Sequence, residues 1–586
     1  MVKRKFRFNV QILDWLEFRS TFGADFYNLK GKQFYSKNSP GGALDNGRAW
    51  QTARNELSLI SENYFTLNKS FDAHKVNLVT GWSVQKNTSE YASAYAYDFE
   101  NELLGYNSLG LGAQFQVSSN AYERFLASYL ARANYSYDDR YLLTVSYRRD
   151  ASSIFLENKW GSFYSGALAW NAKNEAFLES VDLISNLKFR TSWGQTGNQN
   201  IPIQGALLDG EISDYTFDGQ YYTGVSASTL ENKNLNWETS QQLNAGIDLG
   251  FFGNKLNIVA DYYVTNTKDL LLYTPVSIST GFEFGWFNVG ELKNSGYELA
   301  INYGLTTDIG FKWNTSLNIT SSKNEILALG RDGEPIYIDV NFDTKVKDEV
   351  ILQVGGSIND YFGYKVEGIY TAADYDVNGD LLPAVPSEGA GELPGDVKYK
   401  DISGPDGTPD GFIDAYDRTV IGNALPDFYG SFSNNFSFKG VELDVVFNFS
   451  YGNDIFNATK TRISAFTAAG NQTTEWLDSY VNNPSSTQYS RMTSSVPSEL
   501  LIEDGSFLRL QTLRLGYNLP TSLTSKIKAQ SVKVYLAANN LALFTKYSGY
   551  DPEVTSNQGG ASFIQGFDYG AFPRAKTFLL GLNIQF

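Results

Sequence analysis

The feature that most constrains this chain is a strict alternation of apolar and polar residues along many long segments. The clearest example is 441–451, whose apolar row is Val441, Leu443, Val445, Phe447, Phe449 and Tyr451. The intervening row is Glu442, Asp444, Val446, Asn448 and Ser450. Segments 243–250, 256–265, 297–303 and 311–320 repeat the pattern. Successive side chains of a β-strand point to opposite faces, so the alternation predicts strands with one apolar and one polar face.

The length of these segments favours a membrane over a soluble core. They reach about 9–11 residues, which is what a tilted strand needs to cross a bilayer. Strands of soluble sandwiches average nearer about 5–6 residues. Because lipid offers no hydrogen bonds to the backbone, only a closed sheet can present such strands there. We therefore predict an all-β fold, a transmembrane antiparallel β-barrel whose apolar rows face lipid and whose polar rows line a wet lumen.

The connections between the segments have two sizes. Tight turns rich in Gly and Asn are expected at 251–254, 306–308 and 439–440. The long polar connections are 29–48, 86–118, 200–235, 325–349, 372–427 and 453–503. This asymmetry is typical of barrels with short periplasmic turns and long extracellular loops. The last segment, 577–586, also alternates and ends on Phe586, an aromatic end that is usual for the closing strand of an outer-membrane barrel.

Composition narrows the function. Aromatic residues make up 15% of the chain, which suits the aromatic girdles of a barrel but also an aromatic-rich secreted sandwich. A net charge of −17 argues against nucleic-acid binding, which needs a basic surface. There is no cysteine, and the single histidine, His74, sits beside charged residues, so neither a thiolate metal site nor a catalytic triad is expected. The acidic pair Glu503–Asp504 is read as a loop feature, and we expect no enzyme and no catalytic residues.

Several segments resemble the SusC/RagA family of TonB-dependent outer-membrane transporters. One reads Asn-Trp-Glu-Thr-Ser-Gln-Gln-Leu-Asn-Ala-Gly-Ile-Asp-Leu-Gly from Asn236 to Gly250. The others are 185–198, 417–422, 502–510 and 544–554, in the order of the family and followed by the terminal Phe586. The resemblance covers the chain from about residue 120 to the end.

The resemblance implies a barrel of the roughly 22-stranded type with a plugged lumen. It also implies a SusD-like surface lipoprotein as partner, energy supplied through TonB, and oligomeric nutrients, glycans or peptides, as cargo. No signal peptide, plug or TonB-binding segment is recognisable, so we interpret 1–586 as barrel that begins inside the family's pattern. A secreted or surface-exposed adhesin or sugar-binding protein without a pore is the alternative, and an all-β glycoside hydrolase the third reading.

One stretch of the long loop 372–427 has metal chemistry. Segment 406–417 follows the EF-hand loop template, with Gly411 at the sharp turn and Asp in place of the final Glu. The predicted ligands of a structural Ca²⁺ are Asp406, Thr408, Asp410, Phe412 through its carbonyl, Asp414 and Asp417. The alternative is an Asp/Gly/Pro-rich loop with turn chemistry only. Segment 374–380 matches only the first half of the template and is read as a turn.

Tyrosines cluster in two of the long connections. They are Tyr91, Tyr95, Tyr97, Tyr215, Tyr221 and Tyr222. Their rings could stack on a sugar, or they could pack on neighbouring loops or belong to a girdle. The sequence therefore assigns no substrate-binding residue.

Overall fold

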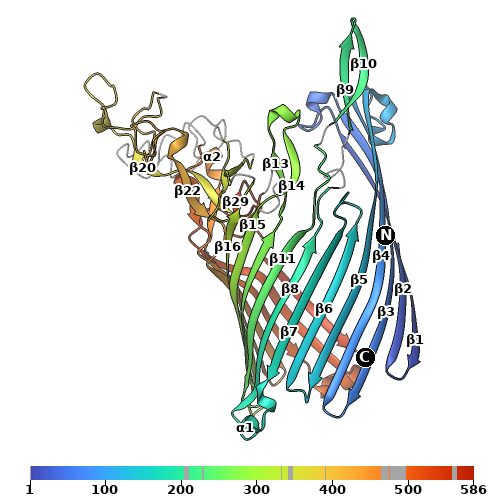
Figure 1. Cartoon of the computed structure of the whole chain (residues 1–586). Coiled ribbons are helices and arrows are strands. Elements are labelled where there is room, and N and C mark those ends of the chain that lie inside the picture. Colours follow the sequence, from blue (N-terminus) through green and yellow to red (C-terminus); the bar gives the residue numbers. More distant parts are fainter. Residues whose placement is uncertain are drawn as a thin grey trace. The chain divides into compact units, whose positions relative to one another are not determined.

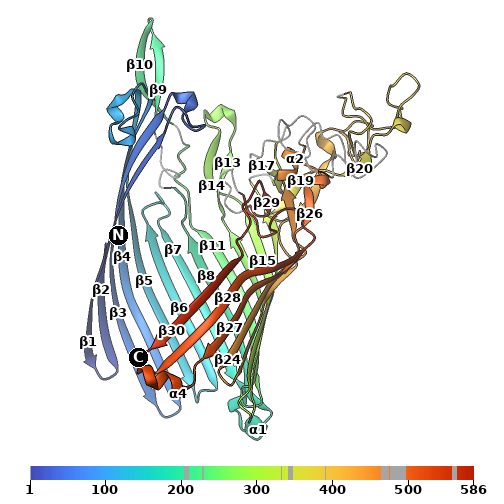
Figure 2. The same ribbon diagram turned by 180° about the vertical axis from the view of Figure 1, so that it is seen from behind.

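The computed structural model consists mainly of long antiparallel strands (Figures 1 and 2). It describes residues 2–202, 210–227, 230–330, 333–340, 347–389, 391–463, 474, 496–556 and 564–586. No helix in these ranges is long and apolar enough to cross a membrane. The chain folds into two compact units. Unit 1 comprises 1–174, 190–243 and 267–289, and unit 2 comprises 175–189, 244–266 and 290–586.

Unit 1 contains an antiparallel meander in which each strand pairs with the next one along the chain. The strands are β1 (Val2–Leu13), β2 (Leu16–Tyr35), β3 (Arg48–Phe71), β4 (His74–Phe99), β5 (Gly112–Tyr137), β6 (Tyr141–Ser152) and β7 (Trp160–Asn171). Short turns connect β3 with β4 and β5 with β6. Asp72 lies in the first of these turns and Asp138 in the second, and both have positive φ. Asp tolerates the left-handed region because its short side chain can bond to the local backbone.

Unit 2 contains a second antiparallel series. It runs through β15 (Glu291–Thr306), β16 (Lys312–Ala328), β23 (Phe428–Phe438), β24 (Val441–Tyr451), β27 (Phe507–Asn518), β28 (Ser531–Thr545) and β30 (Thr577–Gln585), each paired with the next. Strands β8 (Ile184–Asn198), β11 (Glu238–Phe251) and β12 (Leu256–Lys268) contribute residues to both units. The tight turn predicted at 439–440 is confirmed, with φ of 48° at Lys439 and 87° at Gly440.

The register confirms the predicted division into faces. Leu443 lies opposite Phe436 of β23 on one side and Leu515 of β27 on the other, so the apolar rows of three strands align. The next residue, Asp444, lies between Asn435 and Arg514, which places the polar rows together on the other face. Because a slip of one residue would exchange the faces, this alignment is what the alternation in the sequence specifies.

Two of the predicted loops are wrong in extent. The segment 29–48 loses seven residues to β2, which continues to Tyr35, and β4 and β5 extend to Phe99 and from Gly112 into the segment predicted as loop 86–118. Strands β2 to β5 have 20, 24, 26 and 26 residues, at least twice the length needed to cross a bilayer. The hydrogen-bonded strands thus continue beyond the segments in which strict apolar–polar alternation was used to find them.

The other long connections carry small elements. Hairpins β9 (Gly210–Phe217) with β10 (Gln220–Ala227) and β13 (Leu271–Pro275) with β14 (Phe284–Asn288) belong to unit 1. In unit 2 the described parts of 336–427, 453–506 and 546–576 form what we call the loop domain. Its strands are β17 (Ile336–Ile338), β18 (Val350–Leu352), β19 (Asp360–Tyr364), β20 (Val366–Ile369), β21 (Val397–Tyr399), β22 (Arg418–Asn423), β25 (Asp454–Asn457), β26 (Ile502–Asp504) and β29 (Phe567–Asp568). Short helices are α1 (Ala176–Glu179), α2 (Thr459–Ile463) and α4 (Thr521–Thr524).

Candidate functional site: the polar face of the wall and the loop domain

Ion pairs join charged side chains on the polar face of β24, β27 and β28 in unit 2. Arg514 donates to Asp444 at 2.6 Å, and Lys533 pairs with Glu442. Asn435 also donates to Asp444 at 2.6 Å. These side chains come from four strands, β23, β24, β27 and β28, and meet because the register brings their polar rows into line. This part of the face therefore combines hydrogen-bonding groups with charges that are paired.

Unit 1 carries a hollow of about 620 Å³ on its own polar face. Its lining is rich in amides and hydroxyls: Ser146, Ser165, Gln195, Thr196, Asn198, Gln199 and Asn200. Arg148 and Asp150 form an ion pair at 2.8 Å within it, and Arg148 also donates to Ser128 at 3.0 Å. Arg124, which also lines the hollow, donates to the carbonyl of Ile201 at 2.8 Å. The alternation did not single out these residues, because ion pairing across strands depends on a register that one sequence does not reveal.

The clustered tyrosines of unit 1 pack largely on one another. Tyr95 lies 5.9 Å from Trp50 and 5.5 Å from Tyr97 between ring centroids, and its hydroxyl donates to Asp45 at 3.2 Å. Tyr215 stacks on Tyr222 at 5.6 Å across the β9–β10 hairpin. Packing between rings thus describes most of the cluster, and contact with a ligand stays a prediction.

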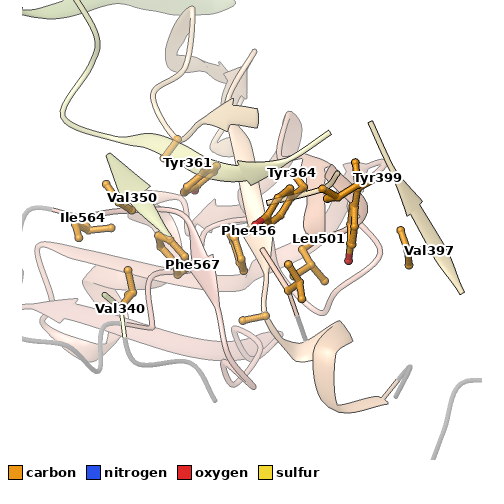
Figure 3. Packing of buried hydrophobic residues seen from close by; sticks show 14 residues of the cluster. Val340, Val350, Tyr361, Tyr364, Val397, Tyr399, Phe456, Leu501, Ile564 and Phe567 are labelled. Carbon is orange, nitrogen blue, oxygen red and sulfur yellow. The ribbon is translucent and has the colours of Figure 1, made fainter. Parts of the chain in front are cut away.

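A buried aromatic cluster holds the loop domain together (Figure 3). Tyr361 of β19, Phe456 of β25 and Phe567 of β29 contact one another with centroids 4.8–5.8 Å apart. The three residues come from three different connections between wall strands. Phe567 lies more than a hundred residues beyond both Tyr361 and Phe456. The rest of the cluster includes Val340, Val350, Tyr364, Val397, Tyr399, Ile413, Leu501 and Ile564. Loops usually run over the surface without a core of their own, so this packing marks a structured unit.

Hydrogen bonds and ion pairs join several of the polar groups in and around that core. The Tyr361 hydroxyl is a hydrogen-bond donor to two backbone carbonyls, that of Asp454 at 3.3 Å and that of Gln565 at 3.2 Å. Burial raises the pKa of Tyr361, so the phenol keeps its proton at every physiological pH. Arg509 pairs with Asp551 at 2.5 Å and with Glu553 at 2.8 Å, which anchors the connection between β28 and β30 to the wall strand β27.

Part of the EF-hand-like loop serves the local backbone. Asp417 is buried, and its carboxylate accepts hydrogen bonds from the amides of Ile402 at 2.7 Å, Ser403 at 3.1 Å and Asp414 at 2.9 Å. Gly411 has φ of 88°, as the predicted sharp turn requires. Within the described part of the chain, no three acidic or histidine side chains are grouped so that they could hold a metal ion. Calcium binding by Asp406, Thr408, Asp410, Phe412, Asp414 and Asp417 stays a prediction.

The residues weighed for catalysis have structural contacts. His74 shares a hydrogen bond of 2.7 Å with the Tyr135 hydroxyl and stacks on Phe71. Glu503 pairs with Lys460 at 2.7 Å and accepts from the Ser548 amide and hydroxyl. Burial alone would raise the pKa of Glu503, but these hydrogen bonds hold its pKa below the usual value. A carboxylate kept ionised in this way is poorly suited to act as a general acid.

Long strands with one apolar and one polar face, short turns at one end and large loops at the other define an outer-membrane barrel. Comparison with known proteins agrees. Residues 4–541 match the family described as TonB dependent receptor-like, beta-barrel, and the chain belongs to this family. It is a bacterial outer-membrane protein of the TonB-dependent transporter class, similar to SusC and RagA.

Three relatives illustrate the likeness. The chain is 35% identical to TonB-dependent receptor P3 of Formosa agariphila over 98% of its own length and 57% of the relative's. It is 31% identical to TonB-dependent receptor SusC of Bacteroides thetaiotaomicron over 79% of its own length and 44% of the relative's. The structure of the RagAB peptide transporter superposes with a TM-score of 0.81 at 24% identity, over 99% of this chain and 61% of that one, which shows the shared fold. The chain thus spans about half the length of the curated relatives it matches.

Proposed function

We propose that this barrel forms the pathway by which an oligomeric nutrient, a glycan or a peptide, enters through the outer membrane. In this proposal a SusD-like lipoprotein on the cell surface delivers the cargo to the loop domain, and TonB supplies energy through a region N-terminal to the barrel. The cargo passes without covalent change, so no catalytic residue is required. The observation that carries the proposal is the loop domain with its buried core.

A preformed loop domain suits the docking of a protein partner. A loop that must order on binding loses conformational entropy, which weakens the complex. The contacts of Tyr361, Phe456 and Phe567 order three loops in advance. The ion pairs of Arg514 with Asp444 and of Lys533 with Glu442 support the proposed passage of the cargo along the wall. A wall with paired charges gives a polar cargo many weak hydrogen bonds without holding it by a strong field.

Two experiments in the native host test this function with the full-length gene product. Deleting the gene should abolish growth on one class of oligomer, either oligosaccharides or oligopeptides, while growth on the corresponding monomers continues. Purification of the tagged transporter should also recover a surface lipoprotein. Unchanged growth on both classes, together with the absence of any lipoprotein, would leave the pore-free adhesin as the better reading.

The role of the loop domain has its own test. Replacing Tyr361 and Phe456 by Ala removes two rings of the core, and we expect the lipoprotein to be lost from the purified complex. Val377→Ala is the matched control, because Val377 is fully exposed at 101% in the same domain. Heat-dependent gel mobility reports whether the barrel itself still folds. If the double variant folds and retains the lipoprotein as well as the control does, the loop domain is not the docking surface.

A further inference from the structure

Strands β5, β6 and β7 lie side by side in unit 1, and the two faces of this part of the wall differ in chemistry (Figure 1). Arg148 of β6 lies on the polar face, where it lines the hollow and pairs with Asp150. Successive residues of a strand point to opposite faces, so the next residue, Arg149, lies on the apolar face. The residues that precede it in that row are Tyr141, Leu143, Val145 and Tyr147. Arg149 is therefore a cation on the side of the wall that we assign to lipid.

The height of Arg149 along the wall places it near the outer boundary of the apolar band. Strand β6 begins at Tyr141 after a short turn, and Tyr141 stands opposite Trp170 of β7, as in an aromatic girdle. Arg149 is eight residues beyond Tyr141. At about 3.3 Å per residue and a tilt of about 40°, it lies about 20 Å from that end, in a band of about 25 Å. The headgroups of the outer leaflet therefore lie close to the level of Arg149.

Aromatic rings and hydroxyl groups surround the Arg149 guanidinium. Its central carbon lies 4.9 Å from the centroid of the Trp160 ring, which stacks on Tyr129 at 6.1 Å. Ser162 stands directly opposite Arg149 on β7, and the Ser162 hydroxyl lies 3.4 Å from that of Tyr147. Among the residues that the structure describes, no carboxylate pairs with Arg149. The guanidinium thus keeps its N–H donors for an anion, with two hydroxyl groups on the same face beside it.

The apolar row has a gap on the side of Arg149 that leads toward the short turns. Val145 of β6 stands opposite Gly166 of β7, which contributes no side chain. A Cβ on Gly166 would meet nothing nearer than a backbone oxygen at 4.0 Å, so the space beside Val145 is open. Leu143 and Leu168 continue the row beyond the gap, and Leu168 is 57% exposed. An acyl chain descending from a headgroup at Arg149 would lie over this gap and contact apolar side chains.

We propose that Arg149 and Ser162 bind the phosphate of a membrane lipid of the outer leaflet, whose acyl chain lies over the gap at Gly166. A guanidinium binds phosphate through two parallel hydrogen bonds, which are about twice as strong as neutral ones. Ionisable side chains that face a bilayer take partners, and the phosphate supplies one for Arg149. A dissolved phosphate ion would use the guanidinium but not the gap. The site lies on the outside of the wall, so it is independent of the cargo and of the proposed function.

Native mass spectrometry of the full-length gene product in detergent measures lipid binding directly. The probes are phosphatidylglycerol, diacylglycerol with the same acyl chains, and inorganic phosphate. Arg149→Gln removes the charge, whereas Gly166→Leu fills the gap and leaves the charge in place. Lys86→Gln is the matched control, because the Lys86 amine also lies over a ring of the apolar face, that of Phe125 at 4.9 Å, but already pairs with Glu123 at 2.6 Å. Heat-dependent gel mobility shows whether each variant is folded.

We expect Arg149→Gln to weaken the binding of phosphatidylglycerol about tenfold or more, because charge-assisted hydrogen bonds are lost. Gly166→Leu should also weaken it although the charge is intact, and Lys86→Gln should change it little. Diacylglycerol should bind the unmodified protein no better than it binds Arg149→Gln. Equal losses in Arg149→Gln and Lys86→Gln, equal binding of the two lipids, unchanged binding in Gly166→Leu, or displacement of the lipid by an equal concentration of inorganic phosphate would each overturn the proposal.

Discussion

The assignment of the apolar rows to lipid predicts that adjacent residues of one strand differ sharply in their tolerance of charge. Leu317 and Asn318 of β16 provide the comparison. Leu317 aligns with Ile301 and Phe432, whereas Asn318 aligns with Ala300 and Ser431. We expect Leu317→Arg to destabilise the folded barrel in lipid strongly and Asn318→Arg to have little effect, because only the first places a guanidinium against acyl chains.

The depth of the residue in the membrane sets the magnitude. Leu317 is five residues beyond Lys312, where β16 begins after a short turn. At about 3.3 Å per residue and a tilt of about 40°, it lies about 13 Å from that end of the strand, near the middle of an apolar band of about 25 Å. Arg at the midplane costs about 2–4 kcal/mol. Leu443 is two residues from the start of β24. The same arithmetic puts it about 5 Å from the end, where the cost falls to about 0–1 kcal/mol.

Urea-dependent folding into lipid vesicles, followed by gel mobility and tryptophan fluorescence, gives the free energy of unfolding for each variant. The expected order of destabilisation is Leu317→Arg, then Leu443→Arg, then Asn318→Arg with Asn448→Arg. The reasoning fails if Leu317→Arg and Asn318→Arg cost the same. It also fails if Leu443→Arg costs as much as Leu317→Arg, since depth would then be irrelevant.

Three further predictions concern the loop domain. Calorimetry should show Ca²⁺ binding that disappears in the variant Asp406→Ala with Asp410→Ala, and an absence of binding heat in the unmodified protein would remove the calcium hypothesis. Glu503 has a lowered pKa, so its ionised form should stabilise the folded loop domain. This stabilisation should be fully present above about pH 4.3 and be lost as the pH falls through the folded-state pKa of Glu503. Protease resistance of Glu503→Gln should accordingly differ from that of the parent protein at pH 7 and converge at low pH, and a constant difference at all pH values would contradict the ionic origin. Tyr361→Phe removes two carbonyl contacts and keeps the ring. It should lower the free energy of unfolding of the loop domain, measured by protease resistance, by about 1–3 kcal/mol, clearly less than Tyr361→Ala does. Equal losses would mean that the hydroxyl, not the ring, stabilises the core.

The sequence predicted those parts of the fold that depend on local pattern. Segment 441–451 became β24 with the same bounds, and the rows opposite Leu443 and Asp444 confirm the division into faces. Tight turns followed from Gly and Asn, whose conformations are read locally. These features are recoverable because a strand with lipid on one face and water on the other must alternate.

What the sequence did not predict depends on contacts between distant segments. Nothing near Tyr361 announces that its ring meets Phe567, since burial of a loop residue arises only when separate loops pack together. The pairing of Arg148 with Asp150 and of Arg514 with Asp444 needs the register. The outer halves of β4 and β5 were assigned to a loop because their sequence does not keep the strict apolar–polar alternation. Calcium binding and cargo binding both stay predictions.

If the barrel takes up an oligomer as proposed, the height of β2 to β5 restricts the route by which that oligomer reaches unit 1. A strand of 26 residues such as β4 rises about 65 Å at the usual tilt, so about 40 Å of it stands clear of the apolar band. The hydrogen-bonded ladder continues through that height and leaves no opening between neighbouring strands. For the proposed function, a large molecule cannot pass between these strands and has to reach unit 1 past their outer ends.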